Sequence, residues 1–367
     1  MDPKKDPFRR CISPDSWPEL DRQAWANCLR AGDLLEGNGA GVSWAPHTRA
    51  KIAKGYGRWL TWLATKGRLD PSTSPVSRVD RKRVAQYVAQ LQALNAPYTV
   101  VARVQELYLA MSAMAPDQDW SWIGSLERQL RRTAHSVRNK RARLVSSSQL
   151  FAYGLELMNQ AEGPTGGTPL QRAVCYRDGL MISLLAARPL RRRNFCSIQI
   201  GRQLTYEAAT YWLRFEAAET KSRMPIEVPL PETLIPNLER YLAHYRPLLK
   251  QRTGRWNRGP MRGQPNSALW ISEDGSAMTE IAIYFRIMRT TRAKFGHVVN
   301  PHLFRDSAAT SIANEDPDNV LITRSVLGHA TLRASERHYN HAQSLKAIRR
   351  YQQHILRLRT QSHPADF

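Results

Sequence analysis

Residues 300–306 read Asn-Pro-His-Leu-Phe-Arg-Asp, and this stretch predicts both the start of a helix and an anion site beside it. Asparagine followed by proline is typical of a helix N-cap and first helical position. His302 and Arg305 then lie three residues apart on one face of the first turns. A helix N-terminus carries partial positive charge and free N–H groups, which favour a phosphate. Taken alone, His-x-x-Arg is a weak signal, because it arises by chance in many chains.

A second helix is predicted over residues 316–328, with Asp316 as its cap and Gly328 at its end. His329 follows the helix terminus immediately, where a histidine is also an ordinary partner of the helix dipole. Tyr339 comes ten residues later, on a short helix that Ser335 can cap. A tyrosine at this distance behind Leu-Gly-His is the informative feature.

A cluster of four arginines within residues 188–193 ends a predicted buried helix over residues 171–190. Such a cluster is often only a solvated rim. Here the apolar residues Leu190 and Phe195 anchor the segment in the core, so one guanidinium group must face inward. A buried arginine needs an anionic partner, and Arg191 is the candidate.

Alternation with a period of two predicts strands over residues 197–200, 211–215 and 226–230, and everything beyond residue 232 is expected to be helical. Lys221 lies in the loop between the second and third of these strands. By itself that loop is an ordinary polar hairpin connection. The predicted fold is therefore mainly α with a small antiparallel sheet.

The charge balance of the 367 residues indicates a polyanionic partner. Lysine and arginine outnumber aspartate and glutamate by 54 to 31, which gives a net charge of +23. Phosphate contacts supply most of the non-specific affinity for nucleic acids, so double-stranded DNA is the expected partner. A membrane surface is the rival interpretation, but no signal peptide is apparent and the apolar run 180–187 is too short to span a bilayer.

The cysteines are scattered without paired spacing, so neither a zinc site nor a disulfide framework is predicted, and reduced thiols in the cytoplasm are expected. They are Cys11, Cys28, Cys175 and Cys196. No carboxylate cluster or phosphate-binding glycine loop suggests a metal or a nucleotide cofactor.

Changes in composition and periodicity divide the chain into five parts. Four amphipathic helices form a small helical domain, and a basic linker connects it to a second domain. The expected boundaries are an N-terminal extension 1–44, the helical domain 45–135, the linker 136–145, the second domain 146–345, and a C-terminal helix and tail 346–367.

The linker carries Arg138, Lys140, Arg141 and Arg143 without apolar periodicity. A short run of this kind is usually a solvated connection. We expect it to serve as a linker whose charges also follow a DNA backbone.

Together these residues resemble the tyrosine recombinases, or phage-type integrases, over roughly residues 48–342. The specific parts of the resemblance are Leu190-Arg191, the hairpin Lys221, His302 to Asp306, and Leu327-Gly328-His329 with Tyr339 downstream. The combined pattern is highly specific, although each piece is weak. Asn194 departs from it, since the family often has an acidic residue there that supports the site.

The resemblance implies that the helical domain 45–135 is a core DNA-binding domain and that residues 146–345 form the catalytic domain. It also implies a role for each of the six residues. Tyr339 attacks the scissile phosphate and forms a 3′-phosphotyrosyl link. Arg191 and Arg305 hold the non-bridging oxygens, and His329 donates a hydrogen bond to a phosphate oxygen. His302 accepts the phenolic proton, and Lys221 protonates the departing 5′-oxygen. No metal or cofactor takes part.

The same resemblance implies a site-specific recombinase that integrates or excises a mobile element. The protein would form a homotetramer on synapsed DNA sites and would be a monomer or dimer when free of DNA. A directionality factor would be a further partner. The protein would lie in the cytoplasm, associated with the nucleoid. The C-terminal helix would dock on a neighbouring protomer, or fold onto its own domain. Two alternatives are a type IB topoisomerase-like enzyme and a non-catalytic DNA-binding protein of the same fold.

Overall fold

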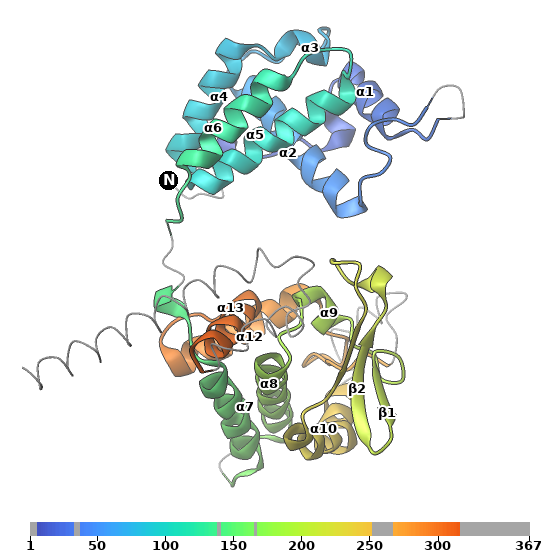
Figure 1. The fold of residues 1–367 in the computed structure, drawn as a ribbon, viewed down its shortest axis with the longest axis vertical. Coiled ribbons are helices and arrows are strands. Elements are labelled where there is room, and N and C mark those ends of the chain that lie inside the picture. The colour runs from blue at the N-terminus through green and yellow to red at the C-terminus, as the bar shows by residue number, and fades with distance from the viewer. Residues whose placement is uncertain (1–5, 33–36, 138–140, 165–166, 252–266, 316–367) are drawn as a thin grey trace, which may run out of the picture. The chain divides into compact units, whose positions relative to one another are not determined.

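A computed structural model of the protein describes residues 6–32, 37–137, 141–164, 167–251 and 267–315. The chain forms two compact units that divide between residues 139 and 140, and Figure 1 shows the elements of each. His329, Tyr339 and the C-terminal helix predicted over 346–367 lie outside the described residues.

The first unit is entirely helical in its described part. Its elements are the 3-10 turns η1 (Pro7–Arg9) and η2 (Pro14–Ser16) and the helices α1 (Glu19–Leu29), α2 (Pro46–Thr65), α3 (Pro75–Arg78), α4 (Arg81–Leu94), α5 (Pro97–Met114) and α6 (Ser121–Thr133).

Local caps and an apolar face account for the bounds and packing of these helices. Asp80 caps α4 by accepting a hydrogen bond from the backbone N–H of Arg83 at 2.7 Å. Gly67 follows α2 in the left-handed conformation, with φ of 66°, which glycine adopts without a steric penalty. The apolar face of α2 is buried, including Tyr56 and Trp59 at 0% exposure.

Residues 6–29 pack into this same helical core. The backbone N–H of Ile12 donates to Thr61 Oγ1 on α2 at 3.0 Å, and the indole of Trp17 donates to the carbonyl of Ile12 at 3.1 Å. The fully buried Asp21 of α1 receives two hydrogen bonds from Arg78 of α3, at 2.7 and 2.8 Å. Tyr56 of α2 donates to the same carboxylate at 2.6 Å. One buried ion pair therefore joins three helices.

The second unit packs helices around one long buried helix and a three-stranded sheet. Its elements are η3 (Arg141–Arg143), α7 (Ser147–Glu162), α8 (Pro169–Ala187), α9 (Arg192–Cys196), β1 (Leu204–Glu207), β2 (Thr210–Phe215), η4 (Ala217–Glu219), β3 (Ile226–Pro229), η5 (Glu232–Leu234), α10 (Ile235–Arg240), the π-helical η6 (Tyr241–Tyr245), α11 (Arg246–Lys250), α12 (Glu280–Phe295) and α13 (Pro301–Glu315).

Close packing of α7 against α8 places α8 at the centre of this unit, as Figure 1 shows. A Cβ atom on Gly154 of α7 would lie 2.5 Å from the carbonyl oxygen of Gly179 on α8, and the reverse contact is the same. Only glycine allows the two helices to approach this closely. Both helices begin with a capping box, at Ser146 and Thr168.

The predicted sheet is antiparallel and small, but one expected strand is wrong. The sheet runs in the order β1-β2-β3, and its first strand is Leu204–Glu207 rather than residues 197–200. Gln199 and Ile200 form only isolated bridges, because the chain turns at Gly201, whose φ is 82°. Leu204 then pairs with Leu213, and both side chains are buried.

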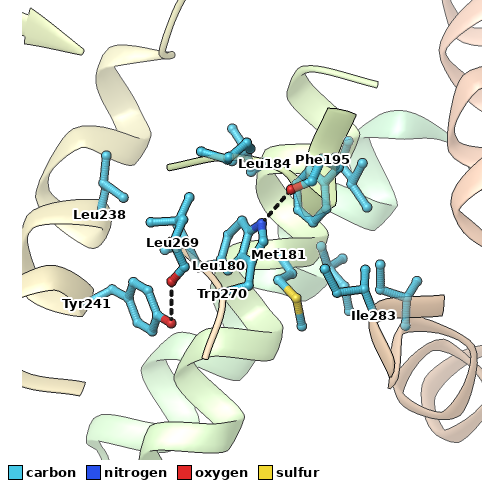
Figure 2. Close-up of a cluster of buried hydrophobic side chains, with 14 of the residues drawn as sticks. Leu180, Met181, Leu184, Phe195, Leu238, Tyr241, Leu269, Trp270 and Ile283 are labelled. Carbon is cyan, nitrogen blue, oxygen red and sulfur yellow. Dashed lines mark hydrogen bonds between the residues drawn. The ribbon is translucent and has the colours of Figure 1, made fainter. Parts of the chain in front are cut away.

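The expectation of helix throughout the region beyond residue 232 is also wrong. Residues 268–277 are not helical: isolated bridges join Ala268 to Gln199 and Ile271 to Ala277, and residues 273–276 form a turn. This segment carries Trp270 into the core beside α8 (Figure 2). Helical periodicity in the sequence does not predict a non-helical segment that places one large side chain in the core.

Loss of the Asp21 carboxylate should destabilise the first unit strongly, because Arg78 would remain buried without its anion. We expect Asp21→Asn to lower the free energy of unfolding of this unit by about 3–5 kcal/mol, measured by denaturant titration. Glu19→Gln in the same helix removes an exposed pair with Arg22 and should cost at most about 1 kcal/mol. Equal effects of the two substitutions would show that the buried pair has no special importance.

Candidate active site

The start of α13 is built as the sequence predicts. The side chain of Asn300 accepts hydrogen bonds from the backbone N–H groups of His302, at 3.0 Å, and Leu303, at 3.1 Å. Leu303 and Phe304 point into the core, with 3% and 0% exposure. This rotation of the helix leaves His302 exposed and buries Arg305, one turn later, to 7% exposure.

Arg305 links α13 to the junction between α8 and α9. Its Nη1 donates a short hydrogen bond to the carbonyl oxygen of Pro189, two residues before Arg191. Burial, and then the positive charge of Arg191, lower the pKa of Arg305 to about 10, while Asp306 acts in the opposite direction. The group is therefore still a cation at neutral pH, and it lies within electrostatic range of a second guanidinium group.

Arg191 occupies the N-cap position of α9 and is half-buried, whereas Arg192 and Arg193 are exposed. Leu190 and Phe195 on either side are buried, as the sequence predicts. Figure 2 shows how the core holds Phe195: its ring stacks on Trp270 at 4.9 Å, and its carbonyl accepts a hydrogen bond from the Trp270 indole at 2.9 Å. The position of Arg191 is thus set by the packing that follows it.

Lys221 lies between β2 and β3, directly after the η4 turn, and its residue is exposed. The adjacent Ser222 hydroxyl oxygen accepts a hydrogen bond from Arg191 Nη1 at 3.3 Å. On the other side of Lys221, the carbonyl of Glu219 accepts a hydrogen bond from the buried Asn194 amide at 3.2 Å. The hairpin that carries Lys221 is therefore attached to α9 at two points.

The structure brings together three of the predicted regions, the α9 junction, the lysine hairpin and the start of α13. Arg191 and Arg305 are electrostatic neighbours, the Lys221 hairpin is bonded to α9, and His302 lies one helical turn before Arg305. With His329 and Tyr339 outside the described residues, the catalytic set as a whole stays a prediction.

The linker cations are only partly described. Arg138 and Lys140 lie outside the described residues, and Arg141 begins η3. Arg143 donates from Nη2 to the carbonyl of Val298 at 2.9 Å, so part of its hydrogen-bonding capacity is used within its own unit. A role for these four residues in following a DNA backbone stays a prediction.

Ser222 and Glu219 are contacts that the sequence did not reveal. A serine after a lysine in a polar loop carries no pattern, and Glu219 contributes its backbone carbonyl, which any residue has. Asn194 was named from the sequence, because it stands where the family often has an acidic residue that supports the site, but its hydrogen bond to Glu219 was not predicted.

The comparisons with known proteins identify the family. A model of the phage integrase family matches residues 157–346, which is more than half of the chain. The chain belongs to the phage integrase family. Its members are tyrosine site-specific recombinases, and the enzyme class predicted from the sequence is confirmed.

Solved structures support the fold of the integrase. The XerH site-specific recombinase bound to difH substrate, in a pre-cleavage complex, is similar with a TM-score of 0.57 and 16% sequence identity, covering 93% of this chain and 98% of that chain. The Tn1549 transposon integrase in complex with transposon right end DNA is similar with a TM-score of 0.53 and 15% identity, covering 87% and 94%. A search of curated protein sequences found no match.

Within the described residues of the integrase, no helix combines the length and the apolar character needed to cross a bilayer. The same residues contain no group of three or more His, Cys, Asp or Glu side chains arranged to hold a metal ion.

The neighbouring guanidinium groups of Arg191 and Arg305 should bind a tetrahedral anion even without DNA. We expect sulfate to raise the unfolding midpoint of the second unit more than chloride at equal ionic strength, by mass action on the folded state. In Arg305→Gln, the difference in midpoint between sulfate and chloride should fall to the part that comes from the general exclusion of sulfate from protein surfaces. Thermal unfolding followed by circular dichroism measures both. Arg289→Gln, an exposed arginine of α12, is the matched control. An undiminished sulfate effect in Arg305→Gln would contradict an anion site here.

Proposed function

We propose that this integrase cuts double-stranded DNA at a specific site and rejoins it through a covalent 3′-phosphotyrosyl link at Tyr339. The observation that carries the proposal is the pair Arg191 and Arg305, two cations held close together by the fold although they repel each other. A phosphodiester between them would reverse that repulsion. Arginine suits this function because its planar fork matches the oxygens of a phosphate.

In the proposed cleavage step, the phenolic oxygen of Tyr339 forms a bond to phosphorus, and the bond from phosphorus to the 5′-oxygen breaks. The two arginines neutralise the non-bridging oxygens, on which negative charge accumulates. A phenol has a pKa near 10 in water, so it needs a proton acceptor. His302 is the candidate, and its exposure at the start of α13 leaves it accessible to a substrate. His329 would donate a further hydrogen bond to the phosphate.

The departing 5′-oxygen needs a proton, and Lys221 is the proposed donor. Its residue is exposed, on a hairpin bonded to the arginine that would hold the phosphate. General acid catalysis of this kind contributes on the order of 10²–10⁴-fold. The reverse step, attack by a 5′-hydroxyl on the phosphotyrosyl bond, restores the tyrosine and rejoins DNA without an external energy source.

Exchange of strands between two DNA sites, with integration or excision of a mobile element, is the proposed biological outcome. The family match supports recombination, and the fold is similar to that of a transposon integrase. The assembly we propose is a homotetramer on two synapsed sites, with a directionality factor as a further partner. The net charge of +23 supports DNA as the substrate.

A nicked suicide substrate tests the covalent step directly. Cleavage beside a nick releases a short strand, so rejoining fails and the protein–DNA adduct accumulates. We expect the adduct with the wild-type protein and none with Tyr339→Phe, as measured by denaturing gel electrophoresis. Tyr351→Phe, a nearby tyrosine, should still form the adduct. An adduct with Tyr339→Phe would assign the nucleophile elsewhere. Relaxation of supercoils by a monomer on DNA without a specific site would instead indicate a topoisomerase.

The salt dependence of DNA binding should separate phosphate contact from chemistry. Log K should fall against log salt by about 0.9 for each phosphate contact. The slope should be the same for wild type and Tyr339→Phe, because the phenol releases no counterion. Arg191→Ala should lower the slope by about one contact. A filter-binding titration over several salt concentrations measures the slopes, and an unchanged slope in Arg191→Ala would argue against its contact with a phosphate.

A further inference from the structure

Two hydrogen bonds connect α9 to the hairpin that carries Lys221, one on each side of the lysine. Arg191 Nη1 donates to Ser222 Oγ at 3.3 Å, and Asn194 Nδ2 donates to the carbonyl of Glu219 at 3.2 Å. We call this pair of contacts the hairpin brace. Its two attachment points are separated only by Thr220 and Lys221.

The hairpin between these points is itself well ordered by internal bonds. The Thr220 hydroxyl donates to the carbonyl of Met224 at 2.7 Å, and Thr220 is 5% exposed. The Glu219 carboxylate accepts hydrogen bonds from Gln203 Nε2 at 2.8 Å and from the backbone N–H of Glu216 at 2.9 Å. These contacts fix the backbone on both sides of Lys221, while its own residue is exposed.

Asn194 suits the brace because it is neutral and can donate. Its side chain is 3% exposed, so the group that it meets must satisfy its amide. An aspartate at this position would bring a carboxylate, which has no proton to donate, against the carbonyl of Glu219. Asparagine therefore fits this position, because its amide can donate a hydrogen bond. An acidic residue would place two hydrogen-bond acceptors against each other.

We propose that Ser222 and Asn194 are positioning residues that hold Lys221 within reach of the departing 5′-oxygen. Because Ser222 is bonded to Arg191, the group that holds the phosphate also fixes the backbone beside the proton donor. Phosphate contact and proton delivery are thus set by one arginine. This inference rests on the proposed function, in which Lys221 is the general acid.

A substrate with sulfur in place of the bridging 5′-oxygen separates positioning of the proton donor from other effects. In the normal step the phosphorus bond to the 5′-oxygen breaks, and the oxygen takes a proton from Lys221 Nζ. A thiol has a pKa of about 8.5, far below that of an alcohol, so a thiolate leaves without that proton. Any residue that acts only through Lys221 becomes dispensable with the sulfur substrate.

The experiment measures single-turnover formation of the covalent adduct by the full-length protein on matched oxygen and sulfur substrates. On the oxygen substrate, Lys221→Ala should be slower by on the order of 10²–10⁴-fold, and Ser222→Ala and Asn194→Ala by about 10-fold, as expected for modest misplacement. On the sulfur substrate all three should approach the wild-type rate. Arg191→Ala should be slow on both substrates, because it holds the phosphate itself.

Two serine variants serve as matched controls. Ser222→Thr keeps the hydroxyl and should retain the wild-type rate on oxygen. Ser276→Ala removes an exposed hydroxyl that bonds only to Asp274, among the hydrogen bonds of the described residues, and should have no effect on either substrate.

The outcomes distinguish failure of the brace from failure of the proposed function. If sulfur does not restore Lys221→Ala, Lys221 is not the general acid, and the proposed mechanism is wrong at that step. If sulfur restores Lys221→Ala but not Ser222→Ala and Asn194→Ala, the lysine role stands and the brace acts in some other way. A wild-type rate of Ser222→Ala on the oxygen substrate would also overturn the brace.

Discussion

Repulsion between two guanidinium groups is the constraint that the described part of the catalytic unit is built to overcome. Burial lowers the pKa of Arg305, and the positive charge of Arg191 lowers it further, so the two groups are held together at a cost in free energy. The surrounding structure must therefore supply that free energy. It does so through the buried residues that flank Arg191 and through the bond from Arg305 to the carbonyl of Pro189.

The core explains how segments more than 100 residues apart meet at this point. Trp270 arrives on a non-helical segment and both stacks on Phe195 and donates to its carbonyl, which fixes α9 against α8 (Figure 2). Phe304 is fully buried on α13, so the same apolar packing sets the rotation of that helix and the direction of Arg305. The placement of Arg191 and Arg305 is a consequence of aromatic packing, not of contacts among the charged groups themselves.

The sequence predicted the parts of this arrangement that depend on local chemistry. Asn300 before Pro301 identified the start of α13, since a cap is a contact within a few residues. The expected strand at 197–200 and the expected helix beyond residue 232 were wrong for a different reason. Their conformation depends on pairing between residues 199 and 268, and no local pattern reports a contact over that distance.

The candidate site shows the same division between local and distant information. Arg191, Lys221, His302 and Arg305 were named because a family resemblance encodes long-range contact in short motifs. Ser222 was not named, because its relation to Arg191 exists only after β2 and β3 bring the hairpin to α9. Residues that hold a catalytic group in place are therefore harder to find from sequence than the group itself.

Two buried arginines of this protein show how a structural cation differs from a functional one. Arg78 is 1% exposed and meets the carboxylate of Asp21 in two hydrogen bonds, so its charge is balanced within the fold. Arg305 is 7% exposed, and burial and the positive charge of Arg191 lower its pKa, while Asp306 acts in the opposite direction. Two buried groups of opposite charge neutralise each other, whereas neighbouring groups of like charge are stabilised by a ligand of the opposite charge. The repulsion between Arg191 and Arg305, rather than burial alone, is therefore the ground on which the proposed phosphodiester contact in the second unit rests.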